Sequence, residues 1–448
     1  MNQHKISRRN FLEIGASFGA LAALSNLNFA QESRNSSGDF VSGEYKALVC
    51  VFLFGGNDGH NTVVPLAANE YNAYRTLRGG LGLTPDKIIT INTNGAAYGL
   101  HYALPELQTL FNQGKMAIVP NVGNLVRPTT RADLTQVPTQ LFSHSDQTAQ
   151  MQNGSPDNSL GTGWGGRTAD VLLPNNAGSI FPSSVSFNGA SLFSSGGQIQ
   201  SASLQPGNDL SQNAMNVYPP AAAAARQQAQ REIIAAQSSF NLINRANKVV
   251  SDALDLNQIL RTAGTGGITT QFPSTSIGQQ LKEATRIISL RATVGVNRQI
   301  FFCGLGGFDT HSAQDYTQWD LLQQLSKALG AFYTATKELG VTNQVTTFTT
   351  SEFGRTLQPS GSGSDHGWGS HQFVIGGAVR GGMMHGAFPV MNTTAPDFLD
   401  NRGILIPKIA LAQYGATLAK WLGVADNQLN SVFPNLSNFA ARDLDFMI

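Results

Sequence analysis

Residues 47–56 read ALVCVFLFGG, an unbroken apolar run that ends in two glycines. A strand with one face in water alternates apolar and polar side chains, so a run without polar positions predicts a strand buried on both faces, as in a parallel sheet. Shorter runs of the same character lie at 116–119, 300–303, 345–349 and 373–375. We therefore expect these segments to be strands of one buried sheet.

Segments with helical periodicity alternate with several of these runs. Residues 277–290 and 409–422 show the pattern. A third segment with helical periodicity ends at Gly340, a candidate C-cap. Its apolar residues recur at i, i+3, i+4 and i+7 and are Leu321, Leu322, Leu325, Leu329, Phe332 and Tyr333. The alternation predicts an α/β fold. We expect a three-layer α/β/α sandwich with a mostly parallel central sheet, whose ligands bind beyond the carboxyl ends of the strands.

The N-terminus has the composition of an export signal, so residues 1–30 are excluded from the predicted fold. Arg8 and Arg9 precede Phe11 and Leu12, as in twin-arginine signals, and a modestly apolar stretch follows. We predict that the twin-arginine export machinery recognises this segment. The mature protein is then expected to be periplasmic or secreted.

The rest of the chain is predicted to form a flexible segment at 31–46 and a single α/β domain at 47–448. Within that domain, residues 153–275 are rich in Ser, Asn, Gly and Ala and include one long Ala- and Gln-rich helical stretch at 221–260. We interpret 153–275 as an insertion or cap over the sheet edge.

Composition excludes several classes of protein. The 448 residues carry a formal net charge of +1, and this near-neutral balance argues against nucleic acid or an anionic membrane as a partner. After the signal, no apolar run approaches the roughly 18 residues that span a bilayer, so we expect no stable membrane insertion once the signal is removed. Only Cys50 and Cys303 occur, both in apolar runs, which predicts buried thiols and no disulfide framework.

Histidines and carboxylates gather in short segments just after the predicted strands. Asp309 and His311 are two residues apart, so in an extended or turn conformation they can share one ion. His366 and His371 follow Asp365, and the surrounding glycines allow a tight bend that brings both imidazoles to one site. An Asx turn with an exposed histidine is the alternative for the first pair.

Other polar residues have two interpretations each. Glu352 is a candidate metal ligand and Arg355 a candidate clamp for a tetrahedral anion, unless the two only form a mutual salt bridge. Asp58 follows the first strand and is either a ligand or a turn cap. Ser143 and His144 are a candidate nucleophile with an adjacent base or ligand, although neighbouring side chains seldom face each other productively.

The candidate donors are oxygen and nitrogen atoms. They suit a divalent metal, zinc first, with manganese, magnesium or calcium as alternatives. The sequence contains no Walker loop, no His-Glu-x-x-His motif and no cysteine pair at zinc-finger spacing.

Taken together, the twin-arginine start and four later motifs resemble the bacterial domain-of-unknown-function family 1501. The motifs read FGGNDG at 54–59, GFDTH at 307–311, SEFGRT at 351–356 and DHG at 365–367. That family in turn resembles the alkaline phosphatase and sulfatase superfamily, whose members hydrolyse phosphate or sulfate esters at a metal site on an α/β sandwich.

This resemblance implies roles for particular residues. It matches Asp309 and His311 to an Asp/His pair for one ion, Glu352 to the Asp of an Asp-His pair, and His366 or His371 to a final histidine ligand. Asp58 is the nearest match for a ligand after the first strand. Phe353 stands where the superfamily pair has histidine, and the superfamily nucleophile has no clear counterpart.

Two functional hypotheses follow. The first is an exported metal-dependent hydrolase of phosphate or sulfate esters, acting on a small-molecule or polysaccharide substrate, with Arg355 binding the anion. The second is a non-catalytic exported protein that keeps the sandwich, and one structural ion, while binding a polysaccharide or another envelope component.

Overall fold

A computed structural model describes residues 44–448 except 94, 96, 180, 200, 208–218, 237 and 263–266. The predicted signal peptide and nearly all of the predicted flexible segment therefore lie outside the described residues. No helix among the residues described is long and apolar enough to cross a membrane.

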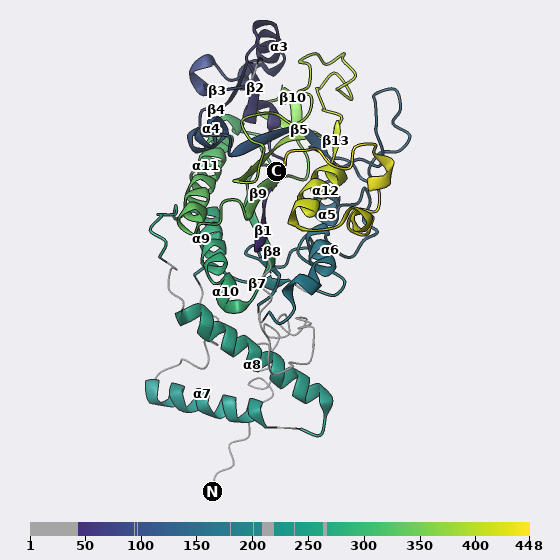
Figure 1. Ribbon diagram of the computed structural model, residues 1–448. Helices are drawn as coiled ribbons and strands as arrows, with labels where there is room; N and C mark the ends of the chain where they lie inside the picture. The colour runs from purple at the N-terminus through teal and green to yellow at the C-terminus, as the bar shows by residue number, and fades with distance from the viewer. Residues whose placement is uncertain are drawn as a thin grey trace, which may run out of the picture.

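A mostly parallel sheet forms the centre of the molecule (Figure 1). In spatial order its eight strands are β13 (Ile409–Ala410), β5 (Met116–Gly123), β12 (Ser370–Gly376), β9 (Val345–Thr350), β1 (Lys46–Phe54), β8 (Arg298–Gly306), β6 (Ser184–Ser186) and β7 (Ala202–Ser203). All pairings are parallel except those of β12, which is antiparallel to both β5 and β9. Each of the five strands predicted from apolar runs is present, and β12 differs from the expectation only in direction.

The central strand β1 is buried on both faces, as predicted. Val49 and Val51 belong to one hydrophobic core, whereas Leu48 and Phe52 belong to the other. The first core is covered by α4 (Pro105–Asn112), α9 (Ser276–Ser289), α10 (Arg291–Val294) and α11 (Gln314–Glu338), and the second by α6 (Trp164–Val171), α12 (Leu411–Leu422) and α13 (Leu429–Val432) (Figure 1). The predicted three-layer sandwich is confirmed.

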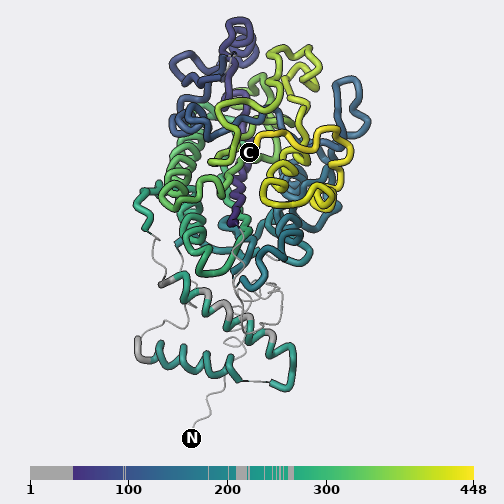
Figure 2. The backbone as a smooth tube through the Cα atoms, in the orientation of Figure 1, coloured from purple at the N-terminus to yellow at the C-terminus, as the bar shows by residue number. Residues whose placement is uncertain are grey.

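The region predicted as an insertion divides into two parts. Its first part belongs to the sandwich, because α6 packs in the second core and β6 and β7 extend the main sheet. The later part forms two helices, α7 (Pro220–Ala235) and α8 (Asn241–Thr262), where one long helix was expected. Figure 2 shows these two helices beyond one end of the sandwich.

Smaller elements lie at the opposite end of the sandwich (Figure 1). A three-stranded antiparallel sheet has the order β2 (Val63–Pro65), β4 (Tyr98–His101), β3 (Ile88–Ile91) and packs beside α3 (Ala68–Arg78). An antiparallel hairpin, β10 (Arg355–Ser360) and β11 (Gly363–His366), links β9 to β12. The remaining α-helices described are α2 (Gly59–Thr62) and α5 (His144–Asn153).

Candidate functional site

The candidate ligands come together because three parallel strands end at the same edge. In the register of the sheet, Phe54 at the end of β1 pairs with Gly306 at the end of β8, and Phe52 pairs with Thr350 at the end of β9. Asp309 and His311 follow β8, and Glu352 follows β9. The β10–β11 hairpin leaves β9 and returns to β12, and its last residue is His366.

A glycine allows these loops to approach closely. Gly55 has a φ of 115°, and a Cβ atom there would lie 2.3 Å from the backbone nitrogen of Asp309. Only glycine combines this backbone conformation with the absence of a side chain. The turn after β1 therefore packs directly against the loop after β8, and its Gly55 N–H donates to Glu352 Oε1 at 2.7 Å.

Asp309 is the centre of the cluster. Its Oδ1 lies 3.1 Å from His311 Nε2, 3.3 Å from His144 Nε2 and 3.5 Å from His366 Nε2. The two nitrogens His311 Nε2 and His366 Nε2 are 2.9 Å apart. Three imidazole nitrogens from three separate segments of the chain thus face one carboxylate oxygen.

Hydrogen bonds at the far side of two of these rings determine their tautomers. His144 Nδ1 lies 2.9 Å from Glu352 Oε1, and His366 Nδ1 lies 2.8 Å from the carbonyl oxygen of Phe142. A carboxylate and a carbonyl only accept, so each Nδ1 carries a proton, and in its neutral form each ring presents the lone pair of Nε2. His144 Nε2 is buried and makes no hydrogen bond despite its distance from Asp309.

This arrangement fits a cation. His311 Nε2 and His366 Nε2 are within hydrogen-bond distance of each other, whereas the buried His144 Nε2 has no hydrogen-bond partner. A metal ion between these nitrogens and Asp309 would be attracted to all of them. Histidines held through Nδ1 by a carboxylate or carbonyl are the usual metal-binding arrangement. Two overlapping sets have ligand atoms within 4.8 Å of one another: His144, Asp309 and His366, and His311, Asp365 and His366.

The charges of the cluster are tuned by its neighbours. Partial burial acts to raise the pKa of Asp309, but the hydrogen bond and charge of Arg355, with His144 and His311, outweigh burial and lower that pKa to about 2. The hydrogen bond to Glu352 raises the pKa of His144. Burial lowers the pKa of His366, which favours the neutral, ligating ring.

Arg355 points inward. Its side chain is 0% exposed, and it donates to the carbonyls of Gly56 and Ser364, each at 3.0 Å, and to Asp309 Oδ1 at 2.6 Å. The guanidinium therefore braces the loops and fixes Asp309. Sequence reasoning missed a second arginine, Arg402, whose side chain is 55% exposed and whose Nη1 lies 3.6 Å from Asp365 Oδ2.

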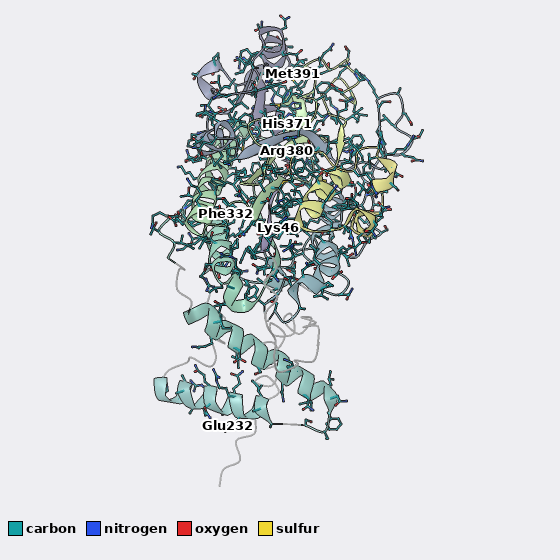
Figure 3. The ribbon with its side chains drawn as sticks, in the orientation of Figure 1. Lys46, Glu232, Phe332, His371, Arg380 and Met391 are labelled. Atoms are coloured by element: carbon teal, nitrogen blue, oxygen red, sulfur yellow. The ribbon has the colours of Figure 1, made fainter. Side chains whose placement is uncertain are left out.

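Three of the predicted ligands lie outside both sets of ligand atoms. Glu352 contacts His144 Nδ1 instead, and Asp58 and His371 are not part of the cluster. Asp58 is buried, caps α2 through the backbone N–H of His60 at 3.0 Å and forms an ion pair with the fully buried Arg78. His371, which Figure 3 labels, is 1% exposed, and its Nδ1 accepts the backbone N–H of Asn121 at 3.1 Å. Burial, with the nearby His60, lowers the pKa of His371 to about 3.

Ser143 acts as the N-cap of α5. Its Oγ donates to Asp146 Oδ2 at 2.6 Å and accepts from the backbone N–H of Asp146. The cap fixes the first turn of the helix, and His144 is the first residue of that turn. The preceding residue, Phe142, adopts a left-handed φ of 76°, which is strained for a non-glycine residue, and its carbonyl is the one that orients His366. No sequence signal marks Phe142.

Phe353 packs against the imidazoles. Its ring centroid lies 4.7 Å from that of His366 and 4.8 Å from that of His144, and the side chain is buried. The position where the resemblance would place a histidine is thus occupied by an apolar support for two candidate ligands.

The chain was compared with known proteins. Among solved structures, it is similar to Ps i-CgsB at 11% identity over 88% of this chain and 77% of that one, with a TM-score of 0.37. It is also similar to the PsFucS1 sulfatase from Pseudoalteromonas sp. at 12% identity over 93% and 72%, with a TM-score of 0.35. A protein in the alkaline phosphatase superfamily from Vibrio parahaemolyticus matches at 10% identity over 94% and 76%, with a TM-score of 0.33.

No curated protein sequence matches the chain. The family described as "Protein of unknown function (DUF1501)" matches residues 45–402, which include every residue of the cluster. The chain therefore belongs to the DUF1501 family.

Proposed function

We propose that this protein is an exported, metal-dependent hydrolase of phosphate or sulfate esters. The observation that carries the proposal is the convergence of three imidazole Nε2 atoms on Asp309 Oδ1, with two of the rings held through Nδ1 so that their lone pairs face inward. The N-terminal sequence supports export.

His144, Asp309 and His366 would hold the ion, with His311 and Asp365 completing a second set that shares His366. A zinc ion there would act as a Lewis acid on the ester oxygen and lower the pKa of an attacking water.

The other residues prepare this site. Glu352 holds the His144 ring in the ligating tautomer, and Arg355 positions Asp309 and stabilises its negative charge. In our proposal the substrate anion is bound by Arg402, because its guanidinium is exposed beside Asp365, whereas Arg355 is buried beneath the site. Water is the nucleophile in this scheme, since the Ser143 hydroxyl is engaged in the helix cap.

Metal content of the purified mature protein tests the proposal. The matched variants are His366→Ala in the cluster and His385→Ala outside it, where the imidazole contacts the Arg380 carbonyl and Phe446. We expect about one or more equivalents of metal in the wild type and in His385→Ala, and loss of metal in His366→Ala. Wild type without metal after exposure to zinc, manganese and calcium would contradict the proposal.

Hydrolysis is measured next, with 4-nitrophenyl phosphate and 4-nitrophenyl sulfate as probes. We expect activity that depends on the metal and falls in Arg402→Ala with metal content unchanged. A fall in kcat/KM that comes mainly from a higher KM would agree with a role in binding the anion.

The second candidate function is a non-catalytic exported protein with a structural ion. Ser143 and Arg355 are the groups that the sequence suggested would act on a substrate. The Ser143 hydroxyl is engaged in the helix cap and the Arg355 side chain is 0% exposed, and these positions favour the second candidate. Bound metal without hydrolysis of either probe, or of a wider ester panel, would favour this candidate.

A further inference from the structure

The turn between α7 and α8 exposes a concentration of large apolar side chains. Ile233 is 69% exposed, Phe240 67%, Leu242 80% and Ile243 46%. These four residues, which we name the apolar tip, lie within eleven positions of the sequence. The described chain has only nine exposed large apolar side chains in all, so the tip holds nearly half of them.

The tip lies away from the sandwich. At the other end of α8, Leu260 is 6% exposed within the first core, and its carbonyl accepts from Arg286 Nη1 of α9 at 2.5 Å. Between Leu242 and Leu260 the helix rises by about 27 Å at 1.5 Å per residue. The tip is therefore held at a distance from the body, and Figures 1 and 2 show α7 and α8 beyond the end of the sandwich.

Polar groups, and not the apolar side chains, hold the turn. Ser238 N–H donates to Asn244 Oδ1 at 2.8 Å, and Asn244 Nδ2 donates back to the Ser238 carbonyl at 2.8 Å. Phe240 N–H donates to Ser238 Oγ at 3.1 Å. None of these bonds uses an apolar side chain, and a concentration of exposed apolar side chains is typical of a surface that contacts a partner.

The charge of the two helices is distributed unevenly. The sequence from 226 to 248, on the side of the tip, contains four cationic residues and one carboxylate, whereas 249–262 contains two carboxylates and one arginine. An excess of cationic residues in the sequence around an apolar tip matches a surface that is apolar inside and anionic at its boundary. The near-neutral charge of the whole chain conceals this local asymmetry.

We propose that the apolar tip docks the protein onto an anionic lipid surface. The apolar side chains enter the boundary between headgroups and acyl chains, and residues such as Arg231 remain at the headgroups. A second copy of the chain is less favoured, because pairing of helices spreads apolar residues along their length, whereas here they gather at one convex end. This proposal is independent of the proposed hydrolase function.

Co-sedimentation of the full mature protein with vesicles tests the proposal. The probes are vesicles of phosphatidylglycerol and phosphatidylcholine in equal parts, and of phosphatidylcholine alone. We expect binding to the mixed vesicles that weakens as salt is raised. In the double variant Phe240→Ser with Leu242→Ser, the partition coefficient should fall by at least about 30-fold, since withdrawing one large apolar side chain from water contributes on the order of tenfold.

The matched control is Leu134→Ser with Val390→Ser, two exposed apolar residues at 39% and 50% that lie outside the tip. The control should bind as the wild type does. Urea unfolding of both double variants checks that each is folded. The proposal is overturned if the wild type does not bind the mixed vesicles or if both double variants lose binding equally. Self-association that the tip variant abolishes, without vesicle binding, would also overturn it and assign the tip to a contact between copies.

Discussion

Removing Glu352 should weaken metal binding without removing any ligand. The carboxylate side chain is 2% exposed, and its Oε1 accepts both Gly55 N–H at 2.7 Å and His144 Nδ1 at 2.9 Å. In Glu352→Ala the His144 ring loses the group that fixes its orientation and tautomer. Loss of such a supporting group weakens metal affinity by about 10- to 100-fold, or about 1.4–2.7 kcal/mol.

A second variant separates charge from geometry. Glu352→Gln keeps an oxygen that can accept both hydrogen bonds, so its affinity should fall only to the lower end of that range. Glu352→Ala also leaves the buried Gly55 N–H unpaired, which costs about 1–3 kcal/mol of unfolding free energy.

Competition against a chelating dye gives the zinc Kd, and urea unfolding of the metal-free proteins gives the stability. Glu338→Ala, which removes a surface glutamate bonded to Thr269, is the control. If Glu352→Ala bound zinc as tightly as the wild type, the argument from the held tautomer would be refuted.

Three further predictions address the remaining polar groups. Asp309→Asn keeps the side-chain shape but removes the central charge, so zinc affinity by calorimetry should fall by at least about 100-fold; an unchanged Kd would exclude Asp309 as a ligand. His371 is neutral in the folded protein at neutral pH, with its pKa lowered by burial to about 3, while in the unfolded chain it binds a proton near the ordinary histidine pKa of about 6.5. The contribution of His371 to the free energy of unfolding is therefore fully present above pH 6.5 and decreases as the pH drops toward 3, by about 2 kcal/mol at pH 5. In His371→Gln the free energy of unfolding measured with urea should depend less on pH, and the metal content should not change. The same pH dependence in the variant and the wild type would contradict the buried, neutral state of His371. Arg78→Met leaves Asp58 charged, buried and unpaired and should cost about 3–5 kcal/mol in urea unfolding; adding Asp58→Asn should recover part of that loss, and no recovery would show that the two residues are not coupled.

The sandwich was predictable because its central strands are continuous apolar runs. The short strands β6 and β7, at one side of the sheet, were not predictable, since they have three and two residues and contain serine, so no apolar run marks them. The break between α7 and α8 was missed for a different reason. Helix propensity is high on both sides, and the break is stabilised by the reciprocal bonds of Ser238 and Asn244.

At the candidate site, residue type and position after a strand were enough to select Asp309, His311 and His366, which the structure brings together. The sequence could not choose between His366 and His371, because glycines between them permit many turns. The choice follows from β12, which begins at Ser370 and places His371 inside the fold. Asp58 caps a turn and is not a ligand in the cluster, because Arg78, twenty positions away, supplies its counter-charge.

The two cysteines lie on neighbouring strands but on opposite faces of the sheet. Cys50 belongs to the second core and Cys303 to the first, and both are fully buried. Burial raises the pKa of each thiol, so alkylation requires the surrounding layer to open. Each thiol is consequently a built-in kinetic probe of one layer. The order in which an alkylating reagent reaches them would reveal which side of the sandwich opens first, without any added label.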